Sequence, residues 1–197
     1  MIEAIAETLI EYRFFGVFLL SLISNSIPFV GVPYLNFLIL LTPFLSFWEL
    51  VVVAILSALG ASLGKVVIYL LGRGIGHTLP EKTKENLLFF QRLLKRWGIF
   101  AIFLFAASPL PDDVLYIPLG MAQYRLRHYF LAVLCGKIVV TSYVMFAGKV
   151  GMEILESYTD NFEFSFAIFL IATVVFTVFV LKFNWRRFFE EFFENKQ

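Results

Sequence analysis

Residues 14–48 read FFGVFLLSLISNSIPFVGVPYLNFLILLTPFLSFW and contain no Asp, Glu, Lys or Arg. A helix needs about 20 consecutive apolar residues to cross a bilayer, so this stretch is long enough to enter a membrane. Pro28 and Pro33 interrupt its middle, and the polar pair Asn25 and Ser26 precedes them. Because proline removes a backbone donor and clashes with the preceding turn, we expect the helix to break here.

The rest of the chain has the composition of a membrane protein. It is 60% hydrophobic and 16% charged, whereas a soluble domain has about 45–50% apolar and about 25% charged residues. Too little polar surface is available to coat a water-exposed globule, so we predict an all-α integral membrane protein. The apolar stretches are 14–45, 47–72, 98–120, 128–149 and 164–182.

The stretch at 98–120 is interrupted in the same way as the first one. Backbone groups freed by a break at membrane depth are tolerated only where they are buried in protein or face a water-filled cavity. We therefore predict that 14–45 and 98–120 are re-entrant hairpins, which dip into the membrane and turn back. The prolines expected to break the hairpins are Pro28, Pro33, Pro109, Pro111 and Pro118.

Charged flanks predict which side of the membrane each connection faces. Lys and Arg concentrate in 73–97, in 121–128 and after residue 181, whereas 150–163 is acidic. The positive-inside rule then places the three basic segments, including the C-terminus, in the cytoplasm. With an external N-terminus, three full transmembrane helices and two opposed hairpins fit every flank.

We expect one membrane domain over residues 1–197, with two amphipathic helices that lie at the headgroup boundary or pack beneath the spans. Its parts are repeat one (about 14–76), an amphipathic connector (80–97), repeat two (about 98–151), a final transmembrane helix (164–183) and an amphipathic tail (184–197).

An internal repeat is the most informative pattern. Gly64-Lys65-Val-Val-Ile is echoed by Gly136-Lys137-Ile-Val-Val, and each copy follows a proline-broken stretch. The predicted topology runs the two copies in opposite directions, which is an inverted repeat. Transporters commonly use this plan, with the substrate site at the midplane between broken elements. The alternative is chance similarity between two apolar helices that contain glycine.

Ionisable residues at membrane depth are expensive and usually mark a pathway. We predict that Lys65, Lys137, Asp112 and Asp113 share one wet central cavity. The alternatives are a structural salt bridge that joins hairpin to helix, and snorkelling of Lys65 to the interface. The predicted substrate path consists of Asp112, Asp113, Lys65, Lys137, Asn25, Ser26 and Ser108.

The sequence gives little support for an enzyme active site or a metal site. The Gly60-Ala-Ser-Leu-Gly64 match to a nucleophile elbow has no preceding strand, which that motif requires. We interpret Gly60, Gly64 and Gly136 as helix-packing positions. His77 and His128 are the only histidines and have no ligand cluster near them. We expect no catalytic residue, metal or cofactor, and no nucleic-acid partner, because the chain has no basic domain.

In order and spacing, the motifs resemble the DedA, or SNARE-associated (VTT-domain), superfamily, and its YqaA-like branch in particular. The resemblance covers roughly residues 10–155 and implies opposed re-entrant hairpins and lipid handling. Relatives are linked to undecaprenyl phosphate return or to phospholipid scrambling. The motifs are Asn25–Phe29, Val32–Tyr34, Gly60 with Gly64, Tyr69 with Gly72, Arg73 and Gly76, Phe105 with Ser108–Asp113, Pro118–Gly120, Phe130 and Gly136.

The chain departs from that family at its charged positions. Relatives with the lipid assignment carry acidic residues where this chain has Ser24 and Tyr34, and arginines where it has Ala106 and Asp112. The charge at the second hairpin is therefore reversed, and the relatives' substrate is not carried over. Lys65 and Lys137 would supply the cationic contacts instead.

Our first functional hypothesis is a flippase or scramblase for an anionic lipid or phospholipid headgroup. A coupling ion such as the proton is a candidate partner, as is a second copy of the chain. The alternatives are an ion-coupled carrier of a small solute and a non-transporting, membrane-organising or partner-binding protein. In a prokaryote the protein would reside in the cytoplasmic membrane.

Cysteine-accessibility labelling tests the predicted topology, with single cysteines introduced after Cys135 is replaced by serine. Positions in 85–95 and 190–197 should label from the cytoplasm, and positions in 153–162 from outside, because basic loops are retained inside. Cytoplasmic labelling of 153–162 would invert the topology. Labelling of positions 97 and 124 on opposite sides would make the second hairpin a full span.

Overall fold

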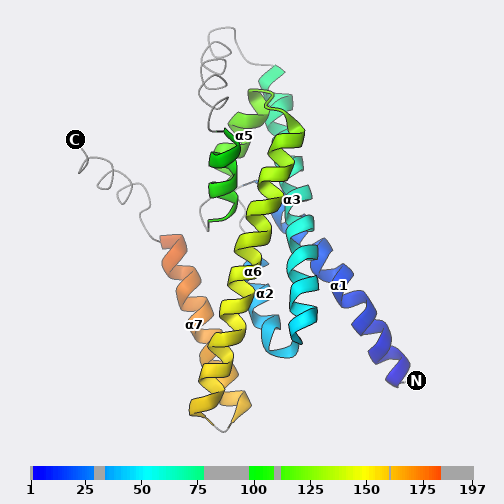
Figure 1. Ribbon diagram of the computed structural model, residues 1–197, viewed down its shortest axis with the longest axis vertical. Helices are drawn as coiled ribbons and strands as arrows, with labels where there is room; N and C mark the ends of the chain where they lie inside the picture. Colours follow the sequence, from blue (N-terminus) through cyan, green and yellow to red (C-terminus); the bar gives the residue numbers. More distant parts are fainter. Residues whose placement is uncertain (1, 29–33, 78–97, 109–111, 160, 183–197) are drawn as a thin grey trace, which may run out of the picture. The chain divides into compact units, whose positions relative to one another are not determined.

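The computed structural model is helical in every regular element of the residues it describes (Figure 1). This confirms the predicted all-α class for that part of the chain. Two compact units, Met1–Val150 and Gly151–Gln197, are each described by themselves. The predicted amphipathic connector and tail, with Pro33, Pro109 and Pro111, lie outside the described residues. Those residues are 2–28, 34–77, 98–108, 112–159 and 161–182.

The first proline-broken stretch forms two helices separated by the predicted break. Helix α1 (Ile2–Ser26) ends two residues before Pro28, as expected where proline follows a helix. Helix α2 (Tyr34–Leu41) then begins and passes into a 3₁₀ turn, η1 (Thr42–Phe44). The break therefore separates a long helix from a short one.

The second proline-broken stretch has the same form. Residues 98–106 are helical, a turn follows, and helix α5 (Asp113–Met121) completes the stretch. The expectation that Pro118 breaks the hairpin is wrong, because α5 runs through it. Proline lacks only its own N–H, so one bond, to the carbonyl of residue 114, is lost. The next turn survives, since the Ala122 N–H donates to the Pro118 carbonyl at 2.9 Å.

Helices α3 (Phe47–His77) and α6 (Leu126–Tyr158) form the long elements of the chain. Among the described residues, these two are long and apolar enough to cross a membrane. A reciprocal cap starts α3: the Ser46 N–H donates to Glu49 Oε2 at 2.8 Å and the Glu49 N–H reaches back to the Ser46 hydroxyl at 3.5 Å. This is the capping-box arrangement.

The second unit contains helix α7 (Phe162–Lys182). The Asn161 side-chain oxygen caps it by accepting the Glu163 N–H at 2.9 Å. The helix has 21 residues, and its apolar segment within the described side chains is Phe162–Val175. The third predicted crossing therefore stays a prediction.

Glycines bring α3 into backbone contact with two neighbours. Gly60 and Gly64 lie against α1, where a Cβ at Gly64 would come within 2.5 Å of the Leu22 carbonyl oxygen. Farther along α3, Gly72 faces the Ile117 carbonyl of α5, and Gly120 of α5 faces the backbone of α3 in return. Helix α3 thus packs against α1 along its first part and against α5 along its second part.

Replacing Gly72 with alanine should destabilise the protein by about 1–3 kcal/mol, because the added methyl group meets a backbone carbonyl that cannot move aside. Gly74 lies on the same helix, and a Cβ added there would meet nothing within 4 Å. Gly74→Ala should therefore be neutral or slightly stabilising. Thermal unfolding in detergent compares the two. Equal melting temperatures would contradict the close contact between α3 and α5.

Candidate functional site

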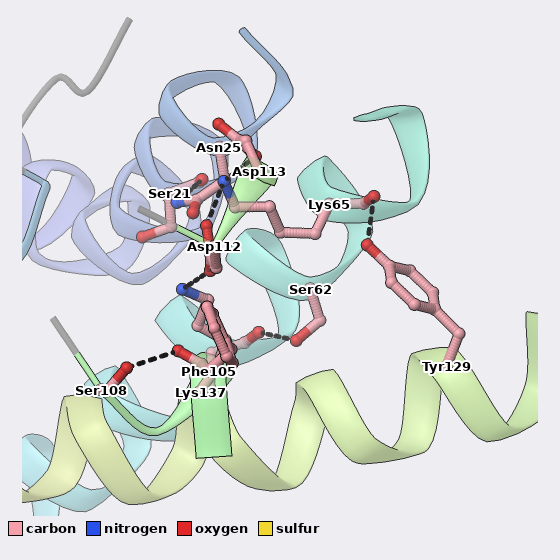
Figure 2. A network of polar contacts seen from close by, with 11 residues as sticks. Ser21, Asn25, Ser62, Lys65, Phe105, Ser108, Asp112, Asp113, Tyr129 and Lys137 are labelled. Carbon is pink, nitrogen blue, oxygen red and sulfur yellow. Dashed lines mark hydrogen bonds and ion pairs between the residues drawn. The ribbon is translucent and has the colours of Figure 1, made fainter. Parts of the chain in front are cut away.

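Four charged side chains meet where the second broken stretch reaches the two long helices (Figure 2). Lys65 Nζ lies 2.6 Å from Asp113 Oδ1 and 2.9 Å from Asp112 Oδ1. Lys137 Nζ donates to Asp112 Oδ2 at 2.7 Å. Asp112 therefore contacts both lysines, one with each oxygen. We call these four residues the ion cluster.

The ion cluster is enclosed by protein. The side chains of Lys65, Lys137 and Asp112 are each 7% exposed, and that of Asp113 is 11% exposed. Burying a charge is strongly unfavourable unless it is paired and hydrogen-bonded. Two ammonium groups and two carboxylates have a formal net charge of zero, so each charge is compensated within the cluster. The structure brings the four together in an enclosed place rather than at an open surface.

Each lysine of the ion cluster follows a glycine that faces the end of a broken-stretch helix. Gly64 lies against the end of α1, where an added Cβ would be 2.9 Å from Asn25 Cβ. Gly136 lies against the end of the 98–106 helix, where an added Cβ would be 2.5 Å from Ala106 Cβ. Close packing at the glycine places the next side chain, a lysine, at the level where the neighbouring helix stops.

The two aspartates enter the cluster from the start of α5. Asp112 is the N-cap residue and Asp113 the first helical residue, where the helix dipole favours negative charge. The Asp112 side chain does not cap its own helix, because both of its oxygens are taken by lysines. Its backbone carbonyl instead accepts the Leu115 and Tyr116 N–H groups at 3.0 and 3.1 Å.

Three tyrosines hold one side of the cluster, and sequence reasoning missed this role. The Tyr129 hydroxyl donates to the Lys65 carbonyl at 2.8 Å. The Tyr129 ring packs on Tyr69 and Tyr116, with centroids 4.9 and 5.2 Å apart. Lys65 Nζ lies 5.9 Å from the centre of the Tyr116 ring. Tyrosine in an apolar helix is ordinarily a packing residue, so only the four-residue spacing from Lys65 to Tyr69 offered a signal.

Three further hydroxyls near the cluster are buried and find no hydrogen-bond partner within the described ranges. They belong to Tyr34, Tyr116 and Thr141. Thr141 lies one turn beyond Lys137 on α6, and Tyr34 belongs to a buried apolar cluster that includes Met145 of the same helix. In the sequence, Tyr34 was singled out only for the family comparison, as the end of the Val32–Tyr34 motif and as a departure from the acidic residue of relatives. The four-residue spacing from Lys137 would have indicated Thr141.

The remaining predicted path residues bond within their own helix ends. The Asn25 amide donates to the Ser21 carbonyl and the Ser26 hydroxyl to that of Leu22, at 2.9 and 2.7 Å. The Ser108 hydroxyl donates to the Phe105 carbonyl at 3.0 Å. Asn25 is buried beside Gly64, whereas Ser26 and Ser108 are half-buried.

The serine of the Gly-x-Ser-x-Gly match lies inside α3. The hydroxyl of Ser62 donates to the Ala58 carbonyl one turn earlier, at 2.6 Å, and the residue is fully buried. It therefore occupies a continuous helix rather than the strand-to-helix turn that exposes a nucleophile. In the described part of the chain, no three His, Cys, Asp or Glu side chains gather in a way that could hold a metal ion.

Comparison with known proteins identifies a family and a relative. The family model of the VTT domain matches residues 32–150, which include α2, α3, α5, the whole ion cluster and most of α6. An uncharacterized protein of Methanocaldococcus jannaschii, MJ0201, is 24% identical over 139 residues, which are 70% of this chain and 84% of that protein. No solved structure matches. The YqaA-like branch stays a prediction.

Neutralising Asp112 should destabilise the protein more than neutralising Asp113. Asp112→Asn removes the charge that contacts both lysines, and an uncompensated buried charge costs about 3–5 kcal/mol. Asp113→Asn leaves Lys65 paired with Asp112, so we expect a smaller loss. Thermal unfolding of the purified variants in detergent measures both. Equal losses would show that Asp112 is not the shared partner.

Proposed function

The chain belongs to the VTT-domain family, and from this premise we propose that this helical membrane protein is a lipid flippase or scramblase. An anionic or phospholipid headgroup passes through the protein at the ion cluster while its acyl chains stay in the bilayer. Asp112, Asp113, Lys65 and Lys137 line the path. A coupled proton is part of this proposal as a second transported species.

The observation that carries the proposal is a buried, charge-compensated ion cluster at the interruption of an apolar segment. Ionisable residues within membrane segments usually mark a substrate or ion pathway. Interrupted helices supply free backbone groups, which favour polar ligands at membrane depth. Here the two features coincide, because Asp112 and Asp113 directly follow the break and lie within 3 Å of Lys65 Nζ.

The proposed architecture is an inverted repeat whose two broken stretches are re-entrant hairpins from opposite sides. The matched contacts of Gly64 and Gly136 with the helix ends support it. A second pair of contacts does so too. Gly72 of repeat one packs on Ile117 of α5, and Gly148 of repeat two packs on Thr42 of η1, where an added Cβ would be 3.1 Å from Oγ1. Each long helix thus reaches the short-helix segment of the other repeat.

Transport by this site requires the ion cluster to open, since its charges are paired with one another in the enclosed form. A phosphate oxygen replaces Asp112 as the acceptor of Lys137 Nζ when the headgroup enters. Asp112 returns when the headgroup leaves, so the lysine is not left unpaired in either state. Protonation of an aspartate would favour the open form, which is how proton coupling would act.

A structural role is the second candidate, favoured by the enclosure and neutrality of the cluster. In that case the ion pairs only join α5 to the long helices, and the protein organises the membrane or binds a partner without transport. Both candidates predict loss of stability when a lysine is removed. Only the transport proposal predicts a change in headgroup selectivity.

Lys137→Gln should lower the transport of an anionic lipid more than that of a zwitterionic one, because the lost interaction is mainly Coulombic. Purified protein in liposomes with fluorescent lipids measures both rates, and a pH gradient tests the coupling. Lys149→Gln is the matched control: Lys149 lies on the same helix and donates to the Leu45 carbonyl at 2.8 Å, so selectivity should not change. A lower melting temperature with unchanged selectivity for Lys137→Gln would favour the structural role.

A further inference from the structure

Lys137 has hydrogen-bonding capacity that its aspartate does not use. An ammonium group carries three N–H donors, and the described residues give Lys137 one acceptor, Asp112 Oδ2. Lys65, by comparison, lies within 3 Å of two carboxylates. The two lysines are therefore unequal: within the described residues two donors of Lys137 and one of Lys65 have no carboxylate acceptor.

Unpartnered hydroxyls occur in the same part of the core: Thr141 lies one turn beyond Lys137 on α6, and the Tyr116 ring centre lies 5.9 Å from Lys65 Nζ. Thr141 and Tyr116 are fully buried and Tyr34 is 8% exposed, and none of the three has a hydrogen-bond partner in the residues described. Native proteins leave few buried polar atoms unsatisfied, so such a group calls for a bound species. An ammonium can only donate and a hydroxyl can donate, so the species that satisfies them together is a ligand rich in acceptor oxygens.

An apolar groove of ≈ 490 Å³ opens beside this polar position, between α3 and α6. This volume is in the range of about 300–1,000 Å³ that is typical of small-molecule sites. One serine is the only aliphatic hydroxyl among the lining residues, and the others are apolar or aromatic. The lining is Phe47, Leu50, Val51, Ala54, Ile55, Ile138, Ser142, Tyr143 and Phe146.

The groove and the polar position are neighbours in the sequence of α6 and share a buried apolar cluster. Ile138 and Ser142 of the groove directly follow Lys137 and Thr141 in the sequence. On the α3 side, Leu50 and Ala54 line the groove and also belong to the buried apolar cluster that contains Tyr34. This placement suits a molecule with an oxygen-rich head and an apolar chain.

We propose that Lys137, Tyr34 and Thr141 bind a phosphate-type oxyanion, and that the groove between α3 and α6 holds the acyl chain attached to it. This inference rests on the proposed function, since it names a lipid-binding position within the proposed transport site. It goes further in assigning the head to three residues and the chain to one groove. Tyr116 carries the third unpartnered hydroxyl, and its ring centre lies 5.9 Å from Nζ of the other lysine, Lys65.

Binding to the purified full chain in maltoside micelles tests the proposal with three probes. Lysophosphatidic acid carries both the phosphate and an acyl chain, monoacylglycerol carries the chain alone, and inorganic phosphate carries the head alone. Wild-type protein should bind lysophosphatidic acid at least about tenfold more tightly than either of the others, because hydrogen bonds to a charged group add to chain burial. If inorganic phosphate bound as tightly as lysophosphatidic acid, the groove would not be part of the binding site.

The head position is tested by Tyr34→Phe and Thr141→Val, which delete the hydroxyls and keep the side-chain shapes. Each should weaken lysophosphatidic acid binding about tenfold or more and leave monoacylglycerol binding unchanged. The unliganded melting temperature should stay the same or rise, because an unsatisfied buried hydroxyl is lost. Unchanged lysophosphatidic acid binding in both variants would overturn the assignment of the head.

The groove is tested by Ile55→Trp, which fills it from the rim, against Val52→Trp as control. Both residues lie on α3 and are 43% exposed, but only Ile55 lines the groove. Ile55→Trp should weaken the two acyl probes alike, and Val52→Trp should weaken neither. Equal effects of the two variants would overturn the groove.

These outcomes are separable from those of the transport proposal. Hydroxyl-dependent binding in a protein that moves no lipid in liposomes would refute transport and keep the binding site. Lipid transport without hydroxyl-dependent binding would keep the function and refute the site.

Discussion

The structure depends on how a charge is accommodated inside an apolar protein in an apolar medium. A lone lysine or aspartate at that depth is strongly unfavourable, and pairing is the remedy available to a helix that cannot reach water. Asp112 is the shared partner in this pairing, because each of its two carboxylate oxygens contacts the lysine of one long helix. This one residue therefore joins the start of α5 to both long helices.

Bringing two lysines to one carboxylate requires helices that lie unusually close, and glycine makes this approach feasible. Gly64 and Gly136 each accept a neighbouring helix against the main chain immediately before the lysine. A larger residue at Gly64 would push α1 away, and a larger residue at Gly136 would push away the 98–106 helix, which precedes Asp112 and Asp113 in the chain. Close packing and charge compensation are therefore properties of the same two-residue sequence, Gly-Lys, used twice.

Much of this could be predicted from the sequence because the signals are local. Absence of charge over 14–48 indicates membrane segments, and Pro28 indicates where α1 ends. Rarity of ionisable residues in apolar stretches was enough to select the four members of the ion cluster. Pro118 was misjudged because a single missing N–H does not end a helix whose following turn is intact.

The tyrosine and threonine contributions were not predictable in the same way, since a buried hydroxyl and a packed ring have the same sequence signature in an apolar helix. Tyr34 comes from a helix remote from Lys137 in the chain, so no local signal connects the two, whereas Thr141 lies four residues from Lys137 on the same helix.

The reciprocal glycine contact between α3 and α5 limits how this molecule can rearrange. Two helices seated backbone to backbone, each in a notch of the other, cannot slide along one another by a residue without a collision of main-chain atoms. They move as a rigid pair or they separate. In the proposed transport, the ion cluster would therefore open where Lys137 of α6 meets Asp112, while α3 and α5 move together.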